Sequence, residues 1–239
     1  MCTTDIKSFI KEKTPDILNG IHSKFKNNEL AFLSLQGKIE LQVRDKFAWE
    51  LQKLLNKKYG KYKYLVRKEW SIDGRKKVDI AILELKLKPE LENKGKTYVW
   101  GKVIALMEFK SHNYLDVSAK QKNEYTRDAF VNDVSKMKDM CDKNSDMTPD
   151  IYYIHLQMCR SQTKGEYIYP DAVSYNTADA ITIKNKNDTK DTKDAVKEFI
   201  ACFKDSISEA KILNEQDFKY VGEAFKCKIY LSPIIIYLE

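Results

Sequence analysis

A glutamate and a lysine, two residues apart, end one of the most apolar segments of this chain. Residues 103–107 are all apolar, and Glu108 and Lys110 follow them. Because side chains alternate between the two faces of a strand, Glu108 and Lys110 should point to the same side. A second strand-like segment, residues 77–83, carries Asp79 near its start. Two carboxylates beside an ammonium group suit the binding of a divalent cation and the hydrolysis of a phosphodiester.

A third acid, Glu40, falls near the apolar stripe of an expected helix at residues 38–57. Apolar residues recur along this segment at helical spacing, namely Val43, Phe47, Leu51 and Leu54. At ~100° per residue, Glu40 lies about 25° from the centre of that stripe, where a carboxylate is costly unless it is paired or binds a metal. Alternatively, the helix begins near Glu40 and its carboxylate is solvated in the first turn, a position that favours acids.

Hydrophobic periodicity predicts the elements that would position these residues. An irregular helical segment at 1–36, with breaks at Pro15 and at Asn19-Gly20, precedes the helix at 38–57. There follow strands at 62–70, 77–87 and 98–110, a helix at 123–142 and a strand at 151–158. Asp73-Gly74 is typical of a hairpin turn between the first two strands. Two hairpin-like connections and then a helical crossover predict an α/β fold, with a mixed central sheet flanked by helices.

The C-terminal third is expected to hold shorter elements. The pattern predicts a loop at 161–170, one or two short strands within 172–183, an exposed polar loop at 184–193, a helix at 194–213 and strands at 225–231 and 234–238. There is no internal repeat and no linker-like segment between these parts and the preceding ones. We therefore expect residues 1–239 to form a single domain.

Composition limits the classes of protein to consider. The chain has 239 residues, 43% hydrophobic and 32% charged, which is enough to bury a core. No apolar run reaches the ~18 residues of a membrane span and no apolar signal core opens the chain, so a cytoplasmic location without membrane contact is expected. Five cysteines without a C-x-x-C spacing argue against a disulfide framework or a zinc site. P-loop and dinucleotide-binding glycine motifs are absent, and a net charge of +7 favours nucleic acid as a partner.

The order of these elements and acids resembles the PD-(D/E)XK, or restriction-endonuclease-like, nuclease superfamily. That family has an αβββαβ core, with an acid on the second core strand and (D/E)-x-K on the third. The matching positions are Asp79 and Glu108-Phe109-Lys110, and Glu40 matches a glutamate that many members place on the first core helix. The resemblance covers roughly residues 38–158 and leaves an N-terminal helical addition and a C-terminal α/β addition outside it.

Two features depart from the family pattern. Val78 stands where the family name has proline. Glu84-Leu85-Lys86 is a competing acid-x-lysine match, but it follows Asp79 too closely to leave room for a turn and a third strand.

The resemblance implies a Mg²⁺-dependent DNA endonuclease, with Mn²⁺ as a substitute metal. Its expected metal ligands are the carboxylates of Asp79 and Glu108, the backbone carbonyl of Phe109, and Glu40 for a second ion. Lys110 would orient or help to deprotonate the attacking water, so the expected catalytic residues are Asp79, Glu108, Lys110 and Glu40. A type II-like restriction enzyme is the first expectation, and a DNA repair or recombination nuclease of the same fold is the alternative. Because cutting both strands of a duplex usually takes two active sites, a homodimer is a further hypothesis.

Several other residues are secondary candidates. Gln121 and Tyr125 match a Gln-x-x-x-Tyr feature of RecB-like and exonuclease branches, yet both lie more than ~120° from the apolar face of the helix at 123–142. Asp133 and Lys136 flank that face, where they could contact the site or the DNA backbone, but we expect them to be surface charges. The lysine-rich segments at 57–58, 61 and 75–77 could contact phosphates.

Two functions from other classes stay open at this point. One is a non-catalytic nucleic-acid-binding or assembly module, although such a module has no need of three acids and a lysine in this order. The other is a cysteine- or histidine-based enzyme. The only histidines are His22, His112 and His155, and no cysteine stands beside one of them in sequence, although such pairs need only meet in space.

Overall fold

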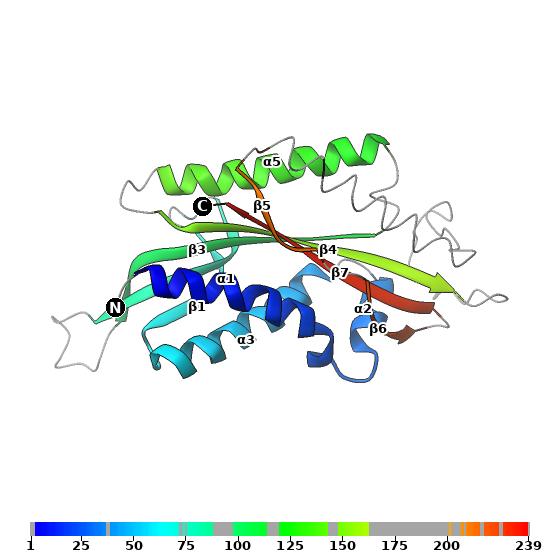
Figure 1. Ribbon diagram of the computed structural model, residues 1–239, viewed down its shortest axis with the longest axis horizontal. Helices are drawn as coiled ribbons and strands as arrows, with labels where there is room; N and C mark the ends of the chain where they lie inside the picture. The colour runs from blue at the N-terminus through cyan, green and yellow to red at the C-terminus, as the bar shows by residue number, and fades with distance from the viewer. Residues whose placement is uncertain are drawn as a thin grey trace.

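The computed structural model describes a mixed sheet with helices on both faces. It covers residues 3–36, 39–71, 74, 76–87, 98–113, 120–142, 148–162, 201, 207, 209–215, 218–224 and 227–238. Figure 1 shows helix α5 (Lys120–Asp142) along one face of the sheet, and helices α1 (Thr3–Gly20) and α3 (Glu40–Tyr59) along the other. No helix in this described part of the chain is long and apolar enough to cross a membrane.

The central elements follow the predicted order. Helix α3 leads to strands β1 (Tyr64–Trp70), β2 (Val78–Leu87) and β3 (Tyr98–Asn113), then to helix α5 and strand β4 (Asp150–Gln162). Strand β2 pairs antiparallel with both β1 and β3, whereas β3 and β4 pair in parallel. Hairpins join antiparallel strands, and a parallel pair needs a longer crossover, which α5 supplies. The predicted α/β fold with a mixed sheet is confirmed.

Three C-terminal strands widen the sheet beyond β4. Strand β7 (Cys227–Leu238) pairs antiparallel with β4, and β5 (Lys211–Glu215) and β6 (Lys219–Ala224) both pair with β7. The path through the sheet is β1-β2-β3-β4-β7-β5. The predicted helix at 194–213 is therefore wrong at its end, because residues 211–213 belong to β5. There Ile212 pairs with Ile236, and this long-range pairing overrides the local helical pattern.

Strand β7 also replaces two predicted strands that were separated at Ser232-Pro233. Pro233 lies inside β7 and pairs with Leu156 of β4. On the other side of β7, the pairing with β5 stops at Ile234 and that with β6 begins at Leu231. Proline is tolerated in a strand where a ladder bond is missing on one side, and this gap between two partners provides such a position.

The N-terminal segment is helical, as expected, and is made of α1, a 3₁₀ turn η1 (Ile21–Lys24) and helix α2 (Glu29–Gln36). The predicted break at Pro15 is wrong, since α1 continues through that residue and ends at Gly20. Helix α1 buries Ile6, Ile10 and Leu18 in the core. This apolar burial offsets the backbone hydrogen bond that proline cannot make.

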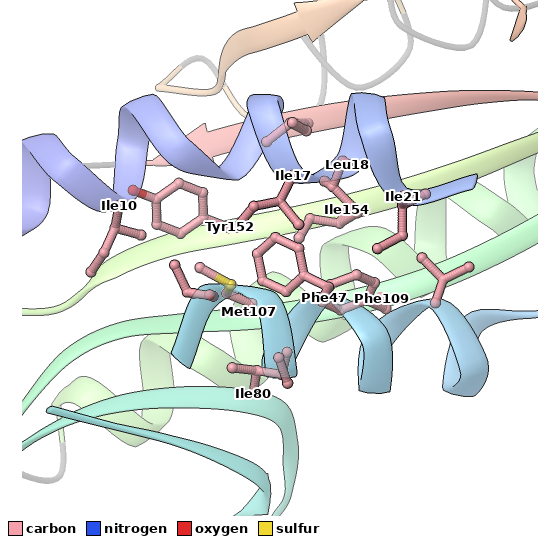
Figure 2. Close-up of a cluster of buried hydrophobic side chains, with 14 of the residues drawn as sticks. Ile10, Ile17, Leu18, Ile21, Phe47, Ile80, Met107, Phe109, Tyr152 and Ile154 are labelled. Atoms are coloured by element: carbon pink, nitrogen blue, oxygen red, sulfur yellow. The ribbon is translucent and has the colours of Figure 1, made fainter. Parts of the chain in front are cut away.

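The core forms two layers, one on each face of the sheet. Met107 and Phe109 belong to the layer under α1 and α3, where the rings of Phe47 and Phe109 lie 5.4 Å apart between centroids (Figure 2). Leu106 belongs to the opposite layer, with Phe130 of α5. Side chains therefore alternate from Ala105 to Phe109, as the sequence predicts, whereas Ile104 shares the layer of Ala105 beside a register shift in the β2–β3 ladder.

Some predictions fall partly or wholly outside the described residues. Strand β4 continues to Gln162, so the predicted loop at 161–170 begins too early. Residues 163–200, which include the predicted strands within 172–183 and the loop at 184–193, are not among those described.

Replacing Phe47 by alanine should destabilise the fold strongly, because this ring is fully buried between α3 and β3. We expect a loss of about 3–5 kcal/mol in the free energy of unfolding, measured by urea titration. Trp49→Ala on the same helix is the control, since Trp49 is 63% exposed and its loss should cost less than about 0.5 kcal/mol. Similar losses for the two variants would contradict the packing of α3 described here.

Candidate functional site

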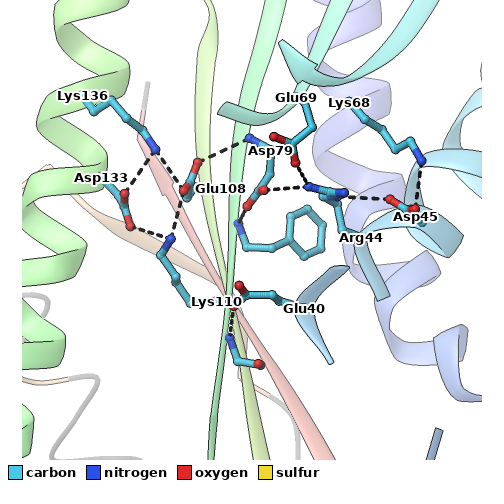
Figure 3. A network of polar contacts seen from close by, with 12 residues as sticks. Glu40, Arg44, Asp45, Lys68, Glu69, Asp79, Glu108, Lys110, Asp133 and Lys136 are labelled. Atoms are coloured by element: carbon cyan, nitrogen blue, oxygen red, sulfur yellow. Dashed lines mark hydrogen bonds and ion pairs between the residues drawn. The ribbon is translucent and has the colours of Figure 1, made fainter. Parts of the chain in front are cut away.

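The candidate site lies where strands β2 and β3 stop pairing through their backbones. Ile80 and Met107 form the last pair of that register at this end. One residue further, the Phe109 amide donates to Asp79 Oδ2 at 2.7 Å, and the Asp79 amide approaches Glu108 Oε2 at 3.4 Å. Each carboxylate is thus bound by the backbone of the opposite strand, which brings the two acids side by side (Figure 3).

Glu108 is the most deeply buried acid of the site. It is 5% exposed and points toward α5, where its Oε1 atom accepts from Lys110 Nζ at 3.0 Å and pairs with Lys136 Nζ at 2.9 Å. Burial and the neighbouring charge of Asp79 raise the pKa of Glu108, and the two ammonium groups oppose that rise. Burial makes the charged form of this carboxylate unfavourable unless a cation lies beside it. Glu108 should therefore bind cations strongly.

Lys110 lies between two carboxylates on the same face of the sheet. Besides Glu108, it pairs with Asp133 Oδ2 at 3.2 Å. Burial alone would lower the pKa of Lys110, but the charges of Glu108 and Asp133 outweigh it and raise the pKa above its ordinary value. The side chain therefore acts as a cation and hydrogen-bond donor at neutral pH.

Asp133 and Lys136 of helix α5 belong to the site and are not simple surface charges. Their side chains are only 17% and 21% exposed. Lys136 contacts both Glu108 and Asp133, and Asp133 also contacts Lys110. The sequence placed the two residues beside the apolar face of the helix, and the packing of α5 on the sheet turns that edge toward Glu108.

Arg44 of helix α3 supplies the counter-charge for Asp79, and the sequence analysis did not identify it. The residue is 6% exposed. Its Nη1 donates to Asp79 Oδ1 at 3.1 Å and to Glu69, while its Nε donates to Asp45 at 3.1 Å. Burial alone would lower the pKa of Arg44, but these hydrogen bonds to carboxylates raise it.

A signal for Arg44 was present in the sequence. It stands four residues after Glu40 and next to Val43, so it shares the helix face that carries the apolar stripe. The reasoning that turned Glu40 toward the core applies less strongly to Arg44, which lies about 65° from the centre of the stripe.

Two outer acids complete the network around Arg44. Asp45 also pairs with Lys68 at 2.9 Å, and these two cations lower the pKa of Asp45 against the effect of its partial burial. Glu69 in β1 adopts a left-handed backbone with φ +49°, which costs about 1–2 kcal/mol in a residue other than glycine. Its ion pair with Arg44 contributes to offsetting that cost.

Glu40 is the first residue of α3, so the alternative prediction about the helix start is correct for its position. Its carboxylate is nevertheless engaged, because Oε2 accepts from the Ser111 amide of β3 at 3.2 Å. Burial, followed by the charges of Asp133, Glu108 and Glu40, raises the pKa of Tyr153, which stands opposite Glu108 on β4. Glu40 thus contacts β3 three residues beyond Glu108.

The donor set fits a hard divalent cation held by two carboxylates. Within the residues that the structure describes, no three His, Cys, Asp or Glu side chains converge closely enough to hold a metal ion. Mg²⁺ usually binds through one or two carboxylates and keeps several waters, and Asp79 and Glu108 are the carboxylates that the site would offer it. In the described part of the chain, five acids and four cations are linked by ion pairs and hydrogen bonds, whereas Glu40 contacts the Ser111 amide. The linked residues are Asp45, Glu69, Asp79, Glu108 and Asp133 with Arg44, Lys68, Lys110 and Lys136.

The competing acid-lysine motif does not meet Asp79. Glu84 lies on β2 itself and pairs with Tyr64 and Lys102. The side chains of Gln121 and Tyr125 lie outside the described residues, as does that of His112. Of the lysine-rich segments, Lys57 and Lys61 are exposed, whereas Lys58 pairs with Asp5 and Lys76 with Asp139.

The described cysteine and histidine side chains do not form a nucleophilic pair. His155 is buried opposite Lys110 in β4, and its ring contacts Gln157 at 3.1 Å. Burial raises the pKa of the Cys141 thiol to about 11, so this cysteine is protonated at neutral pH. Cys141 is therefore a poor candidate for a nucleophile, and the side chains of the other four cysteines lie outside the described residues.

No family model, no curated protein and no solved structure matches this chain.

Replacing Arg44 by methionine should destabilise the protein, because it leaves Asp79 and its neighbouring acids without their shared cation. We expect a loss of about 2–3 kcal/mol in the free energy of unfolding, less than for a fully buried ion pair since Glu69 is half exposed. Arg67→Met, at an exposed position on β1, is the control and should change stability by less than about 0.5 kcal/mol. Equal stability of Arg44→Met and the wild type, by chemical denaturation, would argue against this role.

Proposed function

We propose that this protein is a Mg²⁺-dependent DNA endonuclease of the PD-(D/E)XK type. The observation that carries the proposal is the meeting of Asp79 and Glu108 at the end of the β2–β3 ladder, with Lys110 bound to Glu108. Acid, acid and lysine come from the second and third core strands, as the family pattern requires. Phosphodiester hydrolysis needs charge compensation of this kind around a scissile phosphate.

The fold supports the same assignment. The order α3-β1-β2-β3-α5-β4, with two antiparallel pairings and then a parallel one, agrees with the αβββαβ core that the resemblance implies. The N-terminal helices and the strands β5 to β7 would then be additions around that core. In such a fold the open end of the β2–β3 pair is where the substrate phosphate would enter.

Each residue has a distinct role in the proposed reaction. The carboxylates of Asp79 and Glu108 and the carbonyl of Phe109 would hold Mg²⁺, or Mn²⁺ in its place, and Glu40 would hold a second ion. The bound cation supplies Lewis-acid charge at the phosphate. Arg44 and the two strand backbones keep Asp79 in position for this task.

Lys110 would act on the substrate as a fixed cation. Its ammonium group has three donors, and the contacts to Glu108 and Asp133 use two of them. The third is available for the attacking water or a phosphate oxygen. A charged donor held at this point stabilises the negative charge that develops in the transition state.

The ion pairs themselves favour a second candidate function, a non-catalytic nucleic-acid-binding module on the same fold. Asp79 and Glu108 are both bound by cations in the structure, and no three-ligand metal cluster is found among the described residues. A closed network of this kind could serve stability alone. The net charge of +7 would still attract nucleic acid.

Cleavage assays separate these functions. Supercoiled plasmid and linear duplex DNA are incubated with the protein and Mg²⁺ or EDTA, beside Lys110→Ala. We expect metal-dependent cleavage and a loss of about 10²-fold or more in rate for Lys110→Ala, because the charged donor is removed. Lys138→Ala is the control, since Lys138 lies on α5 and pairs with Glu209 away from the site.

The pattern of products tests the finer assignment. Discrete fragments would support a restriction enzyme, whereas nicking or end-dependent degradation would favour a repair or recombination nuclease. DNA binding without cleavage, in Mg²⁺ or Mn²⁺ and on methylated and unmethylated DNA, would support the binding module and contradict the nuclease.

A nuclease that cuts both strands should assemble as a homodimer on its substrate, because each strand needs its own site. Small-angle scattering at working concentration, with and without duplex DNA, measures the mass of the particle. We expect the mass of two chains in the DNA complex. A single chain per duplex, in a preparation that makes double-strand breaks, would refute the dimer.

A further inference from the structure

Helix α5 closes a ring of four charges around the acid-lysine pair of β3. Glu108 Oε1 is shared by Lys110 at 3.0 Å and Lys136 at 2.9 Å. Asp133 divides its two oxygens between the same lysines, with Oδ2 at 3.2 Å from Lys110 and Oδ1 at 3.2 Å from Lys136. Figure 3 shows this ring between β3 and α5.

The arrangement contains one cation more than the family pattern requires. The pattern accounts for Glu108 and Lys110, whereas Lys136 and Asp133 come from the helix. Lys136 makes a contact with the proposed metal ligand that is as short as that of Lys110. Its side chain is mostly shielded, at 21% exposed, so the ion pair is weakly screened by solvent.

We propose that Asp133 and Lys136 are positioning residues that set the affinity of the site for its divalent cation. Lys136 compensates Glu108 in the metal-free protein and has to leave it when a cation binds there. This inference rests on the proposed function, because it takes Glu108 as a metal ligand. The new element is that two residues of helix α5 determine how tightly the site binds its metal ion.

Electrostatics gives the reason for the displacement. Two cations that share one carboxylate oxygen repel each other at a separation of a few ångströms. Lys136 has a long flexible stem, whereas the strand backbone fixes the position of Glu108. Asp133, three residues earlier on the same helix, gives Lys136 a second carboxylate to bind after it leaves Glu108.

The charge of the ring predicts effects of opposite sign for its two helical members. With two lysines and two acids, the ring is formally neutral. Lys136→Gln makes it negative and removes the competitor at Glu108, so divalent cations should bind more tightly. Asp133→Asn makes it positive and directs both lysines to Glu108, so binding should weaken. The double variant is neutral again.

The experiment is a Mn²⁺ titration of the full-length protein without DNA, followed by the electron paramagnetic resonance signal of free Mn²⁺. We expect the dissociation constant to fall about fivefold in Lys136→Gln, to rise about fivefold in Asp133→Asn, and to return to within about twofold in the double variant. Glu108→Gln marks the site and should abolish this binding. Lys138→Gln, on the same helix but paired with Glu209, is the matched control and should change nothing.

Thermal unfolding of each variant checks that it is folded, and Lys136→Met provides a second neutral substitution. Unchanged or weaker Mn²⁺ binding in both folded Lys136 variants overturns the inference, as does tighter binding in Asp133→Asn. If the ring serves stability alone, the variants will shift the unfolding temperature but not the affinity for Mn²⁺. That result also contradicts the inference.

The outcomes for this inference and for the proposed function are distinguishable. If the wild type cleaves DNA but the Lys136 variants bind Mn²⁺ with unchanged affinity, the inference is wrong and the proposed nuclease function still holds. Glu108-dependent binding with the expected shifts, but no cleavage of any DNA, supports the inference and removes the nuclease. No Mn²⁺ binding in the wild type or in either Lys136 variant overturns both.

Discussion

The whole site depends on one break in the ladder between β2 and β3. Up to Ile80 and Met107 the strands are joined by backbone pairing, and one residue further their carboxylates bind the opposite backbone instead. This exchange ends the backbone pairing of the two strands and fixes both acids. Because the acids are held by regular strands and not by loops, their positions are well defined. The helices on the two faces of the sheet then supply cations to two carboxylates that the strands hold in position.

The cost of placing acids at this break determines what the helices must provide. Glu108 is buried, and its raised pKa reflects the difficulty of keeping it charged there. Helix α3 lies on one face of the sheet and supplies Arg44, which pairs with Asp79. Helix α5 lies on the other face and supplies Lys136, which pairs with Glu108. Losing one partner of such a pair leaves an uncompensated charge, so these cations matter for folding as much as for any chemistry.

Local sequence patterns predicted the strands, and from residue 105 onward they predicted the faces of the side chains in β3, because alternation depends only on residues that are neighbours in the sequence. They did not predict Arg44 or the role of Lys136, since the partner of a helical side chain depends on how the helix is packed on the sheet. The same limit explains β5, where the local pattern predicts the end of a helix. Its strand conformation follows from pairing with β7 across the sheet, and that pairing is a long-range feature.

The charge state of Lys110 narrows the chemistry that this geometry could perform. Two carboxylates hold the ammonium group and raise its pKa, so it is a poor acceptor for a proton at neutral pH. Of the two roles that the sequence allowed for Lys110, orienting the attacking water agrees with its raised pKa better than deprotonating that water. The proton of an attacking water would then have to pass to a carboxylate or to solvent. In this site, catalysis would rest on fixed charges placed around the phosphate more than on a basic lysine.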